Sequence, residues 1–413
     1  MALHKKFFFL LVALIPVQLG YHLWPTWSYV LGRQIDYLSP TLYLTDIITF
    51  LVVASAFFSG VFRKTNTRKF FWSAFSVCVF VFLNVFVSVN RPAAFYGWVK
   101  FSEFLLLFWY MIRAKPGFRG ITNALAVGVL YSSFLAIWQF FLGHSVGGIF
   151  WWFGERTFDL ATPGIARVSV CLPFGNAGCF DRLRAYATFA HPNVFGGFLA
   201  VALPLILYSF RRRVNDRNIL LAFSFVCGTV ALTFSFSRSA WALFAAGVFV
   251  TVYVRARKKT PVVVSGILVF LIALVAVFLS VHAADLSVVR RVELNAAAVT
   301  IFLHHPLFGA GLNNFLELLP QTSAFRTIYF LQPVHNIYLL VLCQVGLVGT
   351  VSIAAVCVYA WKYRRKNMRW SIRYYPFIVM LLVGVIDHYP LTLQQGQLLF
   401  VVSAGLFFLP EAS

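Results

Sequence analysis

Long apolar runs alternate with short polar segments along almost the whole chain. Because a hydrocarbon core about 30 Å thick needs about 20 apolar residues in one helix, each run predicts a membrane-spanning helix. The runs predict twelve such helices, at about 6–20, 42–61, 70–88, 95–112, 121–142, 194–210, 218–234, 239–254, 261–282, 335–361, 373–387 and 393–409. We therefore expect an all-α, polytopic integral membrane protein that forms one membrane domain over residues 1–413. Two long polar loops remain, at about 143–193 and 283–334.

The composition indicates that lipid is the main solvent of this chain. Apolar residues make up 61% of the sequence and charged residues 11%, whereas soluble domains carry about 25% charged residues. A surface with so few charges is poorly solvated by water, so the composition excludes an ordinary soluble domain.

The net charge of +22 comes mainly from basic clusters between the apolar runs. Six clusters hold 23 of the 34 Lys and Arg residues, at 5–6, 63–69, 113–119, 211–217, 255–259 and 362–373. With twelve helices all six clusters fall on one side, which the positive-inside rule identifies as cytoplasmic. We therefore expect both termini in the cytoplasm, both long loops outside a bacterial cytoplasmic membrane, and no nucleic-acid partner.

Two of the six cysteines lie outside the apolar runs. Cys171 and Cys179 are close together in CLPFGNAGC, within the first long loop. Since this loop is expected outside the cytoplasm, a disulfide between them is predicted. The Gly, Pro and Asn residues between them favour a turn that brings the two ends together.

Several arginines lie on the predicted outer side, where the positive-inside rule does not explain them. Arg184 precedes the sixth predicted helix, and Arg238 lies in TFSFSRSAW between the seventh and eighth. Arg290 and Arg291 lie in the second long loop, on a helix predicted at about 287–304. Arginine forks bind phosphate oxygens by charge-assisted hydrogen bonds, so these residues suit an anionic substrate. The alternative is that they anchor the protein to lipid headgroups.

A histidine and a carboxylate are expected at the same membrane face. His335 begins the tenth predicted helix, and Asp387 lies at the outer end of the eleventh. An imidazole with a pKa near 6.5 suits a general base, and Asp387 could orient it or bind a sugar hydroxyl. The alternatives are a helix cap for His335 and an ion-pair partner of an outer arginine for Asp387.

The sequence contains no motif for a cofactor or a metal. There is no HExxH, no Asp-rich run, no phosphate-binding loop and no dinucleotide fingerprint. The substrate must then carry its own activation, as a polyprenyl-diphosphate sugar does. Arginines can stabilise its departing diphosphate without a metal.

Four stretches resemble the O-antigen ligase and O-antigen polymerase family, in the family's order. They are RAYATFAHPNVFGGFLAVALPL, TFSFSRSAW, HHPLFGAGLNNF and VHNIYLLVLCQVGLVGT, and the resemblance extends from about Arg184 to Asp387. It implies a helical membrane bundle that transfers a glycan from undecaprenyl diphosphate to an acceptor hydroxyl, with inversion and without metal or cofactor. The acceptor is a lipid or a glycan, and membrane lipids surround the bundle.

The resemblance also implies roles for individual residues. His335 corresponds to the catalytic base, and Asp387 to its supporting carboxylate. Substrate binding falls to Asn336 and the arginines, namely Arg184, Arg238 and one of the pair Arg290 and Arg291.

Four possibilities remain open: a ligase, a polymerase, a flippase and a membrane scaffold. A ligase and a polymerase share the donor chemistry, and the motifs favour a ligase only slightly. A flippase for lipid-linked oligosaccharide also needs outer arginines, but ionisable residues near the membrane midplane and repeat symmetry are typical of transporters. Here Glu103 is the acidic residue placed deepest in a predicted helix. A membrane scaffold is the fourth possibility, and it gives the clustering of His335 with the arginines no cause.

Overall fold

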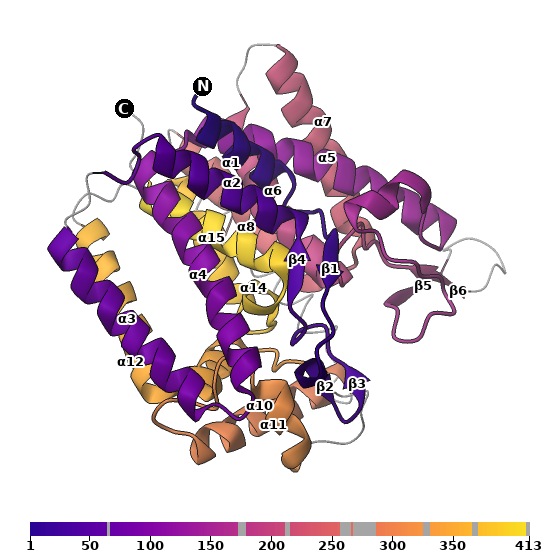
Figure 1. Cartoon of the computed structure of the whole chain (residues 1–413). Coiled ribbons are helices and arrows are strands. Elements are labelled where there is room, and N and C mark those ends of the chain that lie inside the picture. The colour runs from indigo at the N-terminus through magenta and orange to yellow at the C-terminus, as the bar shows by residue number, and fades with distance from the viewer. Residues whose placement is uncertain are drawn as a thin grey trace.

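The chain folds into a predominantly helical bundle in a computed structural model (Figure 1). The structure describes residues 1–63, 67–171, 179–210, 215–256, 266, 286–324, 331–365 and 371–409. Both termini lie at one end, and α10 and α11 lie at the opposite end. The sides of the membrane on which the termini and the second long loop lie stay a prediction.

Helices account for most of the described residues. They are α1 (Leu3–Ala13), α2 (Leu44–Phe58), α3 (Thr67–Val87), α4 (Arg91–Ala114), α5 (Phe118–Leu142), α6 (Pro192–Ser209), α7 (Asp216–Phe234), α8 (Arg238–Arg255), α10 (Leu286–His304), α11 (Phe315–Leu318), α12 (Ile337–Arg365), α13 (Tyr375–Val383), α14 (Tyr389–Thr392) and α15 (Gln394–Phe408). Short 3₁₀ turns occur at Thr26–Ser28, Gly148–Phe153, Leu319–Gln321 and Ile372–Tyr374. The helical class is thus confirmed.

Each predicted span except the ninth overlaps a helix. The ninth, about 261–282, falls outside the described residues except for Gly266, which is helical. Four helices within the described ranges are long and apolar enough to cross a membrane, namely α5, α6, α7 and α12. The figure of twelve spans therefore stays a prediction.

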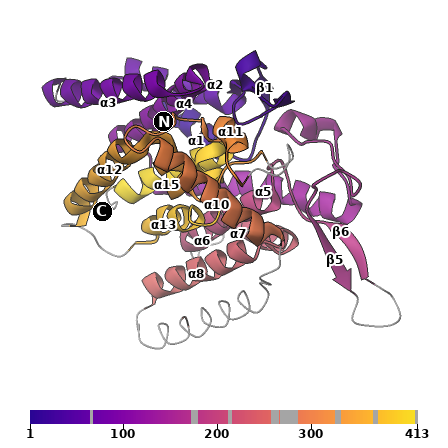
Figure 2. The same ribbon diagram turned by 90° about the horizontal axis from the view of Figure 1, so that it is seen from below.

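Three small two-stranded sheets within the described residues depart from the all-α expectation. β1 (Gly20–His22) pairs with β4 (Thr41–Tyr43), β2 (Tyr29–Val30) with β3 (Arg33–Gln34), and β5 (Arg167–Cys171) with β6 (Cys179–Leu183), all antiparallel. The hairpin β5–β6 projects from the side of the bundle in both ribbon views (Figures 1 and 2). β2, β3, β5 and β6 lie in segments expected outside the membrane, whereas β1 and β4 overlap the end of the first predicted span and the start of the second. Strand pairing satisfies backbone groups that no helix uses.

Two predicted helices are shorter than expected. α1 ends at Ala13 instead of residue 20, because Pro16 lacks an N–H and disfavours a helical residue before it. α13 ends at Val383, so Asp387 lies in a non-helical connection between α13 and α14. The conclusion that Asp387 ends a helix is corrected: it follows the helix by four residues.

α6 is the central helix of the bundle. It packs against α5, α7, α8 and α13, and most of its side chains are buried. Gly196 permits the close approach of α8, since a Cβ there would lie 2.9 Å from the Cβ of Ala240. Gly196 therefore serves the close packing of α6 against α8.

A second apolar cluster covers the outer end of the bundle. Leu294, Ala297 and Ile301 of α10 pack with Phe315 of α11 and Leu340 of α12. The predicted helix at 287–304 is confirmed as α10, which begins one residue earlier. One face of α10 is buried against the bundle, so protein contacts hold this helix as well as any contact with lipid headgroups.

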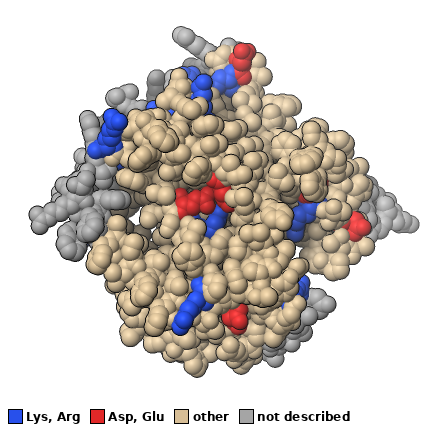
Figure 3. All heavy atoms as spheres, in the orientation of Figure 1, with Lys and Arg blue, Asp and Glu red and all other residues tan. Residues whose placement is uncertain are grey.

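A group of charges is buried between α2, α4 and α15. Lys100 Nζ lies 2.7 Å from Asp46 Oδ1 and 2.9 Å from Glu103 Oε2, and Gln394 Nε2 donates to Asp46 Oδ1. Figure 3 shows acidic and basic atoms together near the middle of a largely uncharged face. Glu103 is therefore one member of a mixed group, in which Lys100 neutralises part of the acidic charge.

Candidate active site

Arg184 joins two elements at the outer end of the bundle. Its Nε donates to the carbonyl of Ser235 at 2.8 Å, and its Nη2 donates to Asn193 Oδ1 at 2.9 Å. Asn193 lies in the first turn of α6, and Ser235 lies in the turn between α7 and α8. A guanidinium has five N–H donors, so these two bonds position Arg184 and leave donors for a ligand.

Arg238 opens α8 on the other side of the same turn, and its side chain is exposed. Burial lowers the pKa of the Arg184 guanidinium, and the positive charge of Arg238 lowers it further. The two cations are therefore close enough to repel each other. An anion bound between them would relieve this repulsion, and the first turn of α8 favours negative charge as well.

His335 and Asp387 meet as the sequence predicts. His335 Nδ1 lies 3.6 Å from Asp387 Oδ1, and both side chains are mostly buried. This separation is long for a hydrogen bond but suits an ion pair once the imidazole is protonated. Burial acts to raise the pKa of the Asp387 carboxyl, but its contact with His335 and the nearby His388 hold that pKa below its ordinary value.

Two further histidines lie beside this pair, and the sequence does not single them out. The ring of His388 lies 4.8 Å from that of His335 between centroids, and its Nδ1 is 2.6 Å from Thr392 Oγ1. His191 caps α6, with its Nδ1 accepting from the Asn193 N–H. Burial lowers the pKa of each of these two rings to about 4, so both are neutral at neutral pH.

A small cavity of about 20 Å³ lies between α6, α8, α10 and α13. Its polar lining comes from Asn193, Ser239, Arg291, Asp387 and Tyr389. Arg291 is half-buried here, whereas Arg290 is exposed and is not part of the lining. The geometry thus distinguishes the two arginines, which the sequence does not.

Tyr389 presents a hydroxyl to this cavity that has no hydrogen-bond partner in the structure, although the residue is only 2% exposed. Gly197 makes the room, since a Cβ at that position would lie 1.9 Å from Tyr389 Oη. An unpaired buried hydroxyl costs about 1–3 kcal/mol. The tyrosine is therefore a candidate to bind a ligand oxygen, and no sequence motif indicates it.

Asn336, which the resemblance assigns to substrate binding, caps a helix in the structure. Its Oδ1 accepts from the N–H groups of Tyr338 and Leu339, at 2.9 and 3.1 Å. These bonds cap the start of α12 and fix the turn that carries His335. The structure therefore supports a positioning role for Asn336.

The predicted disulfide is only partly within the described residues. Cys171 and Cys179 are opposite each other in the register of β5 and β6. Their side chains lie outside the described part of the chain, so the disulfide stays a prediction.

The structure also brings together three possible metal ligands that are not recognisable from their spacing in the sequence. Ligand atoms of His335, Asp387 and His388 lie within 4.8 Å of one another, a spacing that could hold a metal ion. One imidazole nitrogen of His388 is already engaged by Thr392. Transfer in the presence of a chelator tests whether this group holds a metal.

These observations define a class: a helical membrane protein with paired arginines beside a histidine and a carboxylate. A family model described as O-antigen ligase matches residues 223–354, about a third of the chain. This match confirms the resemblance to the O-antigen ligase and polymerase family. It includes Arg238, Arg291 and His335, whereas Arg184 and Asp387 lie outside it. No curated protein and no solved structure matches the chain.

Proposed function

We propose that this protein is an O-antigen ligase-like glycosyltransferase of the bacterial cytoplasmic membrane. It moves a glycan from undecaprenyl diphosphate to an acceptor hydroxyl at the outer face. The observation that carries the proposal is the contact of His335 with Asp387, beside a cavity that Arg291 and Asp387 line. This arrangement combines a proton acceptor with cations for a leaving group.

The diphosphate is bound by Arg184, Arg238 and Arg291. Arg184 and Arg238 flank the turn between α7 and α8, and Asn193 connects Arg184 to the cavity that holds Arg291. These guanidinium groups stabilise negative charge as the bond between sugar and phosphate breaks. Tyr389 adds a hydrogen bond to a substrate oxygen.

His335 takes the proton of the acceptor. Its Nδ1 is turned towards Asp387, so Nε2 is the nitrogen available to the acceptor hydroxyl. As that oxygen bonds to the anomeric carbon, the carbon–oxygen bond to the diphosphate breaks, and polyprenyl diphosphate leaves with the bonding electrons. One displacement inverts the anomeric centre, and Asp387 stabilises the resulting imidazolium.

A polymerase would use the same donor site and differ in its acceptor. The acceptor of a ligase receives one completed glycan, whereas the acceptor of a polymerase is the growing glycan itself. The matched family description favours the ligase. The buried charge group of Lys100, Asp46 and Glu103 is the feature that a flippase would use, so transport is the alternative to test.

The test is transfer by purified protein, with an undecaprenyl-diphosphate glycan and a candidate acceptor in the presence of a chelator. The proposal expects metal-independent transfer, with one block added by a ligase or a ladder by a polymerase. Activity that vanishes with chelator and returns with a divalent cation would reassign His335, Asp387 and His388 to a metal centre. Movement of the lipid-linked glycan across a liposome without transfer would establish a flippase.

A further inference from the structure

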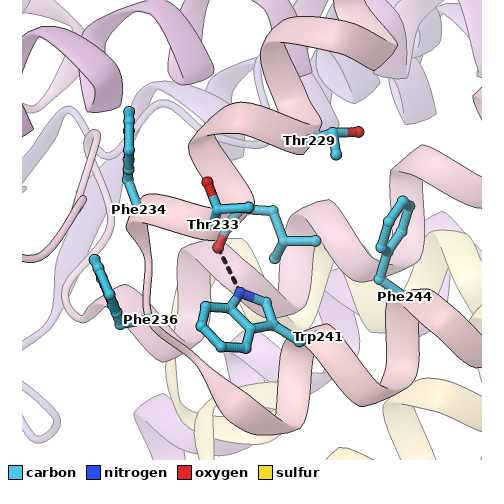
Figure 4. A pocket seen from close by; sticks show the side chains of 7 residues that line it. Thr229, Thr233, Phe234, Phe236, Trp241 and Phe244 are labelled. Carbon is cyan, nitrogen blue, oxygen red and sulfur yellow. Dashed lines mark hydrogen bonds between the residues drawn. The ribbon is translucent and has the colours of Figure 1, made fainter. Parts of the chain in front are cut away.

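An apolar groove runs along the outer halves of α7 and α8. Its volume is about 350 Å³. Aromatic side chains dominate the view in Figure 4, and the lining residues are Thr229, Leu232, Thr233, Phe234, Phe236, Trp241 and Phe244. It is distinct from the small polar cavity beside Asp387, which lies on the other flank of α8.

The few polar groups of the groove are already engaged. The hydroxyls of Thr229 and Thr233 donate to the carbonyls of Phe225 and Val230, and Trp241 Nε1 donates to the carbonyl of Leu232 at 2.9 Å (Figure 4). The groove therefore offers no free donor from these side chains to a sugar or a headgroup. It suits a hydrocarbon chain, which needs none.

The groove begins at the turn between α7 and α8, which Arg184 contacts and Arg238 follows; we call it the arginine turn. Phe234 and Phe236 line its upper end and flank Ser235, whose carbonyl binds Arg184. Arg238 and Trp241 are three residues apart on α8, so they occupy the same face, with Arg238 one turn above. An apolar chain in the groove would thus have its anionic end next to both arginines.

We infer that this groove binds the first isoprene units of the polyprenyl chain of the donor. The inference rests on the proposed function, because it concerns the lipid chain of the donor that we propose there. The continuity of an apolar groove with a pair of cations matches a lipid with a diphosphate at its end. Binding of the chain would direct the diphosphate to Arg184 and Arg238 before the sugar reaches His335.

The test compares two donors with the same diphosphate glycan, one on an undecaprenyl chain and one short donor that carries a methyl group and no isoprene unit. Thr233→Trp fills the groove from its exposed edge. We expect the KM of the undecaprenyl donor to rise about tenfold, the effect of losing burial of about two methylene groups. The KM of the short donor should stay unchanged.

Val230→Trp is the matched control, because Val230 is 40% exposed on the same helix and does not line the groove. It should leave both KM values unchanged. An unchanged KM for the undecaprenyl donor in Thr233→Trp would overturn the inference and leave the groove to ordinary membrane lipid.

A second variant covers the case in which Thr233→Trp disturbs the arginine turn and impairs both donors alike. Thr229→Trp fills the groove one turn further from Arg238. It should impair only the undecaprenyl donor, and equal use of that donor by variant and wild type would contradict the inference. Wild-type protein that transfers from neither donor would instead refute the proposed function.

Discussion

Tyr389 and Tyr375 are two buried tyrosines whose hydroxyls have opposite roles. Tyr375 Oη lies within hydrogen-bond distance of two carbonyl oxygens, those of Ala200 at 2.9 Å and Leu243 at 2.7 Å. Its O–H therefore links α13 to α6 and α8. Tyr389 Oη has no such partner and lies against Gly197, in the cavity beside Asp387. The first hydroxyl stabilises the bundle, whereas the second is kept for a ligand.

Tyr389→Phe should therefore lower transfer without lowering stability. It removes one hydrogen bond to substrate, worth about 0.5–1.5 kcal/mol, which corresponds to a rate loss of about 2- to 10-fold. Tyr375→Phe should do the reverse, with a lower thermal midpoint and normal turnover. Transfer rate and melting temperature of both variants test this, and full activity of Tyr389→Phe would remove the hydroxyl from the site.

Arg290 and Arg291 are neighbours in sequence but differ in environment. Arg291 lines the cavity with Asp387, whereas Arg290 is exposed. Arg291→Lys should impair transfer about tenfold or more, because lysine keeps the charge but loses the bidentate fork. Arg290→Lys is the matched control and should leave kcat and KM close to those of the wild type. Equal transfer rates of the two variants would show that Arg291 has no role in transfer that Arg290 lacks.

At the residue scale, sequence reasoning reached the side chains that a motif or an unusual position distinguishes. His335 and Asp387 were predicted as a pair and do lie together. Tyr389 and His388 were missed, because an aromatic residue near a membrane interface is common and its orientation depends on tertiary packing. The capping role of Asn336 was not predicted, and its part in substrate binding stays a prediction.

At the scale of elements, apolar periodicity predicted where helices occur but not where they end. Pro16 and Gly384 end α1 and α13 early, and both signals were present in the sequence. The hairpin β5–β6 was not predicted, since short strands outside a membrane carry little hydrophobic signal. The helix α10 was predicted well because Pro306 follows it closely.

The start of α6 gives a prediction about pH. His191 caps this helix through Nδ1, which must be unprotonated to accept from the Asn193 N–H. Burial and, to a lesser extent, the positive charge of Arg184 lower the pKa of His191 to about 4. The unfolded chain binds this proton near pH 6.5 and the folded one near pH 4, so this site favours the folded state fully above pH 6.5. Its contribution is lost as the pH falls from 6.5 towards 4.

His191→Asn keeps a capping side chain but cannot titrate. We expect its thermal midpoint in detergent to fall less than that of the wild type between pH 6.5 and 4. His388 is buried in the same way and does not change in this variant, so part of the slope should remain. Identical pH profiles for the two proteins would show that His191 is not the titrating cap.

At the scale of the whole molecule, one charge group connects the N-terminal and C-terminal parts of the bundle. Asp46 belongs to α2, Lys100 and Glu103 to α4, and Gln394 to α15. Lys100→Met leaves two carboxylates buried without their cation, which should destabilise the fold by about 3–5 kcal/mol. Lys6→Met removes an exposed charge near the N-terminus and should have little effect.

The double variant Lys100→Met with Glu103→Gln separates charge from packing. It removes one of the carboxylates that Lys100 neutralises, so its loss of stability should be smaller than the sum of the two single losses. Additive losses of melting temperature would mean that Lys100 and Glu103 do not interact. A variant that stays folded but no longer transfers would instead give the charge group a part in function.

The central claim is that an outer-face histidine acts as the base of a glycan transfer. The most direct test is the rate of transfer by purified His335→Ala, with undecaprenyl-diphosphate glycan and acceptor, beside wild type and the exposed control His304→Ala. Loss of general-base catalysis predicts a rate about 10²- to 10⁴-fold lower for His335→Ala, in protein that stays folded at the assay temperature, with normal activity of the control. Wild-type turnover by His335→Ala would contradict the account.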